Sequence, residues 1–349
     1  MFPISAVDAV SPAVQRTKIF LFRPFHFGTY LKLCLVALLT EGLGGNGNFN
    51  PGSHHYSNHK TTVSSFTSFA IAPERIAESV AALALVLLLC FFLFYLITRL
   101  RFAYFHCLIH NTKEIRPGWH IYREPATRFF WFNLIVGLCF LLLVGLIAIP
   151  FAAGFVGLFR NVAAGGHPDL GSILALLLPL IPIIMLIVVL AIAVDIVLRD
   201  LMLPHYALEN ATAGQAWSAV WARIRFEKGS FFVYALLRVL LPIVALVILF
   251  VVLILPAIVF AIAIVAVEVG IHAAFSGAQG TTAIIGLFLE VFVGVIAFAI
   301  ALVAWIAIGG PLSTAIRQYA ILFYGSRYQP LANILFPPPP VAPPAPGTA

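Results

Sequence analysis

The sequence predicts an all-α fold, a polytopic transmembrane helical bundle of about six spans with amphipathic interfacial helices on the cytoplasmic side. Three observations predict it. Hydrophobic residues make up 62% of the chain and charged residues only 9%, with a mean hydropathy of +1.05, whereas soluble domains carry about 25% charged residues. Apolar runs of about 20 residues, enough to cross a bilayer, recur along the chain. Lys and Arg gather in alternate gaps between those runs.

Six apolar regions could each cross the bilayer as a helix. A backbone inside lipid must form its hydrogen bonds internally, which leaves only helices and closed barrels. Continuous Leu, Val, Ile and Ala without two-residue alternation exclude a barrel. The predicted spans are residues 27–44, 76–98, 130–155, 173–198, a fifth region that starts at Phe231, and 283–308.

The fifth region is too long for one straightforward crossing. Residues 231–267 would form a helix of roughly 55 Å, whereas the hydrocarbon core is about 30 Å thick. Pro242 and Pro256 lie within it and favour kinks or a break, because proline removes a backbone donor. We therefore expect one crossing, followed by a short interfacial or re-entrant segment after Pro256.

The distribution of positive charge predicts the orientation. Seventeen of the 20 Lys and Arg residues lie on one side of the predicted membrane. They precede or enter the first span, follow the second or fourth span (one of them just inside the fifth), or follow the last span. The other three are Lys60, Arg75 and Arg160. Since Lys and Arg accumulate on the cytoplasmic side, we expect a multi-pass protein of the cell inner membrane with both termini in the cytoplasm.

This topology divides the chain into three parts. Residues 1–26 form an N-terminal interfacial segment whose basic side chains meet anionic lipid headgroups. Residues 27–332 form the six-helix transmembrane domain, with an outside loop at 45–72 that is rich in Gly, Asn, Ser and His. Residues 333–349 form a disordered proline-rich tail. As a polyproline-II segment the tail could dock onto an aromatic groove of a protein partner, and a plain disordered end is the alternative.

A degenerate internal repeat follows the even-numbered spans. After spans two and four the chain carries a basic start, then Asn111 or Asn210, a Trp, and a Phe–Phe pair. A shorter version follows span six, and the N-terminal RTKIFLFRPFHFGTY is similar to the second half of the unit. The pattern predicts three helical hairpins joined by cytoplasmic interfacial helices, including 101–110 and 213–226, and chance similarity is the alternative. We expect the basic residues of 223–228 to face water or headgroups.

Motifs for chemistry are mostly missing from the sequence. It contains no P-loop, no GxGxxG at a strand–helix turn, and no GxSxG, HExxH or CxxC pattern, and its four cysteines suggest no disulfide framework. Histidines at 54, 55 and 59, and His106 with His110 and Glu114, resemble metal-ligand spacings, but they are more simply loop and headgroup-level residues. We expect no enzyme activity, no cofactor, no metal and no nucleic-acid partner.

Ionisable residues inside predicted spans are the best binding candidates, because charge at the bilayer centre is costly. Asp195 and Arg199 are four residues apart and can pair on one helix face. Glu290 lies inside the sixth span without a nearby charge in sequence, on a stripe of small residues that should face the bundle. We expect it to be neutral and to have no cationic partner, and we expect Glu41 and Glu268 to lie at the outer boundary.

Several segments carry a resemblance to a known group. They are RTKIFLFRPFHFGTYLKL, RLRFAYFHCLI, IYREPATRFF, AWSAVWARIRFEKGSFFVY and PLSTAIRQYAILFYG. The chain resembles uncharacterised bacterial six-helix integral membrane proteins, which are similar in turn to the membrane domain of some glycerophosphodiester phosphodiesterases. The resemblance implies the six-helix topology. The catalytic domain of those enzymes is missing, so their activity is not implied.

Three functions remain open at this point. A non-catalytic membrane protein that scaffolds partners or shapes the bilayer fits the missing chemistry and the interfacial helices. A transporter or permease for a small or lipid-like solute would use Glu290, the proline breaks and the repeat. A membrane-embedded lipid enzyme would need polar residues clustered at one depth, and no such cluster is visible in the sequence.

Overall fold

The structure is a computed structural model that describes residues 3–42, 73–165, 169–277 and 280–337. Within these ranges every regular element is helical. The predicted outside loop 45–72 and residues 338–349 of the predicted tail lie outside the described residues. The elements are α1 (Val10–Phe22), α2 (Phe27–Glu41), α3 (Pro73–His110), α4 (Ile115–Ile121), α5 (Arg123–Ala163), α6 (Leu170–Ile196), the π-helix η1 (Val197–Met202), α7 (Leu203–Glu209), α8 (Ala213–Phe226), α9 (Lys228–Phe275), α10 (Thr281–Gly325) and α11 (Gln329–Leu335).

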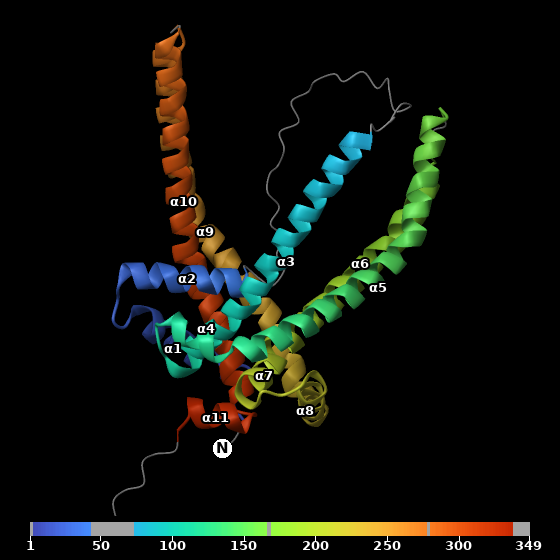
Figure 1. The fold of residues 1–349 in the computed structure, drawn as a ribbon, viewed down its shortest axis with the longest axis vertical. Helices are drawn as coiled ribbons and strands as arrows, with labels where there is room; N and C mark the ends of the chain where they lie inside the picture. The colour runs from blue at the N-terminus through green and yellow to red at the C-terminus, as the bar shows by residue number, and fades with distance from the viewer. Residues whose placement is uncertain (1–2, 43–72, 166–168, 278–279, 338–349) are drawn as a thin grey trace, which may run out of the picture.

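Five described helices, rather than six, are long and apolar enough to cross a membrane. They are α3, α5, α9, α10, and α6 with its continuation through η1 and α7. The first predicted span is wrong. It forms α2, which has only 15 residues and lies across α10 near the base of the molecule (Figure 1). The helix ends at Gly42, whose positive φ of 63° takes the chain out of helical geometry and is open to glycine at little steric cost.

The long helices diverge from a compact base. Figure 1 shows the hairpin α9–α10, the single helix α3 and the hairpin α5–α6 spreading apart, with the short helices gathered where they converge. Both α1 and α11 lie at this base. The N–H of Ile4 donates to Ser326 Oγ at 3.2 Å, which joins the two ends of the described chain. The link from Gly42 to Pro73 lies outside the described residues.

The fifth predicted region is one continuous helix. α9 runs for 48 residues with Pro242 and Pro256 inside it, so the expected re-entrant segment after Pro256 is not formed. Proline in a membrane helix removes one hydrogen bond, and neighbouring helices or small local adjustments can compensate for that loss. The helix therefore continues to Phe275.

The buried core lies in the base and not between the spans. Its members come from α1 and α2, the last turns of α3, η1, α7 and the second half of α10. The most apolar 18-residue window contains no buried residue in four of the five candidate spans, and 6% in α10. The predicted interfacial helix 101–110 is correspondingly the end of α3, and Phe102 to Ile109 are almost all buried.

The structure supports the internal repeat. Asn111 and Asn210, which the sequence aligns, both have left-handed φ values, of 54° and 51°, and both end a helix. An arginine precedes each asparagine at nearly the same distance: Arg101 lies ten residues before Asn111, and Arg199 lies eleven residues before Asn210. The π-helix η1 accommodates the one extra residue of the second unit. A short helix and a long helix then follow in each case, α4 and α5 or α8 and α9.

The third unit is divided between the two ends of the chain. α10 occupies the position of α3 and α6, and the N-terminal α1 and α2 pack against it. Arg327 Nη1 donates to the carbonyl of Ile4 at 2.9 Å, beside the bond from Ile4 to Ser326. In this third unit the helix in the place of α5 or α9 is α2, which is too short to span.

Candidate functional site

Buried charged side chains converge where the long helices meet. The centre is Asp200 in η1, which is 3% exposed. Its Oδ2 accepts from Arg238 Nε at 2.9 Å and from the Tyr234 hydroxyl at 2.7 Å, and its Oδ1 accepts from Arg317 Nη1 at 3.0 Å. We call the cluster the charge hub and define it by these residues: Glu41, Arg101, Asp195, Arg199, Asp200, Arg238 and Arg317.

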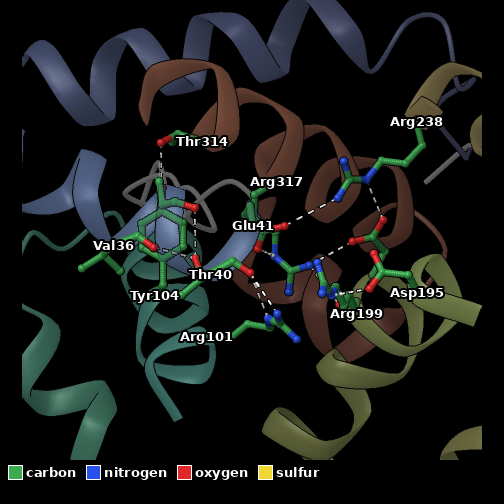
Figure 2. Close-up of polar contacts among 12 residues, drawn as sticks. Val36, Thr40, Glu41, Arg101, Tyr104, Asp195, Arg199, Arg238, Thr314 and Arg317 are labelled. Carbon is green, nitrogen blue, oxygen red and sulfur yellow. Dashed lines mark hydrogen bonds and ion pairs between the residues drawn. The ribbon is translucent and has the colours of Figure 1, made fainter. Parts of the chain in front are cut away.

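Glu41 brings α2 into the hub. Its carboxylate lies 3.5 Å from Arg238 Nη2 and 3.5 Å from Arg317 Nε (Figure 2). The expectation that Glu41 lies at the outer boundary is wrong, because it followed from treating α2 as a crossing helix. Glu41 is 4% exposed and sits at the base.

Two further arginines complete the hub from α3 and η1. Arg101 is buried and donates through Nε and Nη2 to the carbonyl of Thr40, at 3.2 and 3.0 Å. Arg199 forms the predicted ion pair with Asp195 (Figure 2). The carbonyl of Arg199 accepts from Arg317 Nη1 at 2.9 Å. The hub therefore joins α2, α3, α6 with η1, α9 and α10.

The hub carries an excess of positive charge. Four guanidinium groups face three carboxylates, and arginine stays charged at any accessible pH. Burying such ions costs several kcal/mol each, which close pairing must offset. Removing one partner leaves the others uncompensated. The four surface cavities that stand out in the described part of the chain contain no charged hub side chain in their linings.

A second polar cluster holds the short helices of the base together. His205 in α7 is buried, with Nδ1 3.1 Å from Glu209 Oε2 and Nε2 2.6 Å from the Tyr324 hydroxyl. Arg223 Nη1 approaches the same Nε2 at 3.3 Å, and its guanidinium lies 5.1 Å from the centre of the Tyr328 ring. The tautomer with a proton on Nδ1 satisfies all three contacts. Arg223 is half-buried and turns back toward α7 and α10, so the expectation that it faces water holds only in part, whereas Arg225 and Lys228 are exposed as expected.

Glu290 lies far from the hub, near the start of α10. Its Oε1 is 3.1 Å from His272 Nδ1 of α9, and the two side chains are 31% and 78% exposed. Glu268 lines an open surface cavity together with His272 and Glu290. The expectation that Glu290 is an isolated acid is wrong, because His272 lies within hydrogen-bond distance. The hairpin register brings the last turns of α9 beside the first turns of α10, which no local sequence pattern reveals.

The small residues of α10 do face another helix, as predicted. A Cβ on Gly286 would lie 2.8 Å from Phe275 Cβ, and a Cβ on Gly294 would lie 3.8 Å from Glu268 Oε1. The large side chains of the opposite face, such as Phe288 and Phe298, are exposed. The partner is α9 alone, because no closed bundle forms at this level.

Charged residues bound the apolar stretch of each long helix at two levels. At 1.5 Å per residue the three longest charge-free stretches measure roughly 40 to 48 Å. A bilayer is about 40–45 Å thick with its headgroups. The bounding residues are Arg128 and Arg160 in α5, Arg238 and Glu268 in α9, and Glu290 and Arg317 in α10. Glu268 and Glu290 therefore match the far headgroup level and not the bilayer centre.

The predicted candidates fall into two places. Asp195 and Arg199 belong to the hub, and Glu290 does not. Asp200, Arg238 and Arg317 are hub residues to which the sequence analysis assigned no site. A signal existed for Arg317 and Asp200, since each lies at the end of a long apolar run in the aligned repeat units, but nothing in the sequence pairs them.

A family model described as a family of unknown function (DUF7544) matches residues 4–334. No curated protein and no solved structure matches the chain. The family match contains no link to the glycerophosphodiester phosphodiesterases.

Proposed function

Because the chain belongs to this family of unknown function, we propose its role from its own structure. It is a multi-pass membrane scaffold without catalytic activity, in which the charge hub clamps four of the apolar helices (α3, α6, α9 and α10) and the short α2 at one membrane surface. The exposed apolar side chains of the diverging helices contact the bilayer. The observation that carries the proposal is the contrast between the hub at the base and the apolar windows of the spans, which contain almost no buried residue.

The chemistry of the hub supports the absence of catalysis. Each hub carboxylate lies beside at least one guanidinium group, so it is a poor general base. The cluster of polar residues at one depth that a lipid enzyme needs is present, but Asp200 is hydrogen-bonded to Arg238 and Arg317 and Glu41 lies 3.5 Å from the same two guanidinium groups. The partner of the exposed faces is the lipid bilayer itself.

The proposed orientation places the base in the cytoplasm and the far ends of the spans outside. The resemblance to the membrane domain of the phosphodiesterases agrees with a membrane role and adds no activity. The basic side chains of the base meet anionic headgroups, each contributing about 1 kcal/mol. Glu290, which motivated the transport alternative, matches the far headgroup level, so we do not propose transport.

Cysteine labelling of intact cells tests the orientation. With Cys90 and Cys139 replaced by alanine, a cysteine at Ala164 should react with a membrane-impermeant maleimide, because Ala164 is exposed at the far end. A cysteine at Ser218, exposed on α8 at the base, should react only after lysis. The opposite pattern would place the base outside.

Spin labels test the scaffold against a transporter. Labels at Leu88 of α3, Leu142 of α5 and Val251 of α9, all exposed, should be accessible to oxygen and shielded from a water-soluble nickel chelate. This is the pattern of acyl-chain contact. A transporter with a water-filled path between the diverging helices would expose at least one of these labels to nickel, and that result would reject the scaffold proposal.

A further inference from the structure

A groove separate from the charged side chains of the hub opens where α6 and α9 leave the base. It has a volume of about 260 Å³ and lies between α6 with η1, α8 and the first turns of α9. Its lining is almost entirely apolar, and Lys228 is its one charged residue. The side chains that matter below are Leu201, Ile224, Phe231, Tyr234, Ala235 and Lys228.

The groove is continuous with the membrane-facing surface. Above it α6 and α9 diverge (Figure 1), and the exposed face of α9 carries Phe232, which is 71% exposed, and Leu236. On α6 the exposed Val189 and Leu190 continue the apolar surface. An acyl chain can therefore pass from the bilayer into the groove without crossing a polar barrier.

α8, which contributes Ile224 to the groove wall, carries residues typical of the headgroup level. Trp217 and Trp221 of α8 stack 6.0 Å apart and are about half exposed, as expected of an aromatic belt. Arg225 lies 5.2 Å from the Trp221 ring centre. Neither Arg225 nor Lys228 forms an ion pair with a described residue, so both are free to meet an anion.

We propose that this groove binds one anionic phospholipid, with an acyl chain against Phe231 and Ala235 and the phosphate beside Lys228 and Arg225. The proposal rests on the membrane placement argued above and goes beyond it by assigning a defined lipid site. Charge complementarity at Lys228 and the continuity of the apolar surface select this occupant.

The site is linked to the charge hub. Tyr234 lines the groove, and its hydroxyl donates to Asp200 Oδ2 at 2.7 Å. A bound chain therefore packs against a side chain that holds the central hub carboxylate in place. Lipid binding should stabilise the folded protein through this contact, because a ligand that binds only the folded state raises its stability.

Native mass spectrometry of the purified full chain in detergent tests the site. Phosphatidylglycerol should be retained in preference to phosphatidylcholine with the same acyl chains. Lys228→Ala should weaken phosphatidylglycerol binding about fivefold, the expected effect of losing one basic contact at the membrane surface. The matched control is Arg116→Ala, which removes an exposed charge from α4 at the same base and should leave binding unchanged.

A second variant tests the acyl chain separately. Ala235→Phe fills the groove and should weaken binding of both lipids. It should also abolish the rise in melting temperature that phosphatidylglycerol causes in the unchanged protein. Equal effects of Lys228→Ala and Arg116→Ala would show only diffuse attraction and overturn the site, as would unchanged binding in Ala235→Phe. These readouts are independent of nickel accessibility in the spans, so failure here is distinguishable from failure of the scaffold proposal.

Discussion

Replacing Asp200 by alanine should destabilise the protein more than any other single change considered. Arg238 and Arg317 would remain buried next to each other without their shared carboxylate, and breaking a buried ion pair from one side costs about 3–5 kcal/mol. An unfolding entropy of about 2.1 cal/mol/K per residue implies about 1.4 °C per kcal/mol for 349 residues, so the melting temperature in detergent should fall by about 4–7 °C. Fluorescence-detected size-exclusion chromatography after heating measures this.

Asp195 provides the matched control. It is an aspartate five residues earlier, pairs with Arg199 alone, and its side chain is 29% exposed. A partly exposed pair of this kind contributes less than a fully buried one, so Asp195→Ala should lower the melting temperature by clearly less than Asp200→Ala does. Equal losses in both variants would show that Asp200 has no special place. A double variant, Asp200→Leu with Arg317→Met, should recover part of the stability, because it removes one of the two guanidinium groups left without Asp200, and the other still lies 3.5 Å from Glu41.

Gly310→Ala should separate α2 from α10. A Cβ at position 310 would lie 2.2 Å from Cys34 Cβ and 2.5 Å from Cys34 Cα, so backbone and not a flexible side-chain end would have to move. Burial raises the pKa of the Cys34 thiol to about 11, so Cys34 stays protonated and packs as a small apolar side chain. Overpacking of this kind costs about 1–3 kcal/mol, and the contact is tight enough to expect the upper end.

The consequences of that separation reach the hub. α2 is also held by the Tyr30 hydroxyl, which donates to the Ala307 carbonyl at 2.7 Å, and α2 carries Glu41. The melting temperature should therefore fall by several degrees in the same assay. Gly294→Ala is the control in the same helix, since its Cβ would meet nothing closer than 3.8 Å and alanine is the better helix former. A harmless Gly310→Ala would argue against the packing of α2 on α10.

The sequence predicted the class and most of the spans for a simple reason. Apolar length and low charge are local properties, and they suffice to predict α3, α5, α6, α9 and α10 as long helices. The repeat was also readable locally, because Asn111 and Asn210 end helices through their own backbone preference. The Asp195–Arg199 pair was predictable because residues four apart share a helix face.

Helix direction and partner choice were not readable in this way. The residues that form α2 are apolar enough for a crossing. They stay at the base because α2 packs across α10 at Gly310 and because Glu41 pairs with Arg238 and Arg317. The pairing of Glu290 with His272 likewise depends on hairpin register. Proline positions suggested a break in α9 that the helix does not make.

By itself, the sequence determined that this chain is an all-α protein with long apolar helices and a one-sided distribution of basic residues. Composition and period are enough for that, because lipid requires internally bonded helices and orients them by charge. The tertiary structure alone decided that five helices have the length of spans, that they diverge, and that a charge hub closes their base. Those features arise from contacts between residues as much as 276 positions apart, such as Glu41 and Arg317, and no local pattern encodes such contacts.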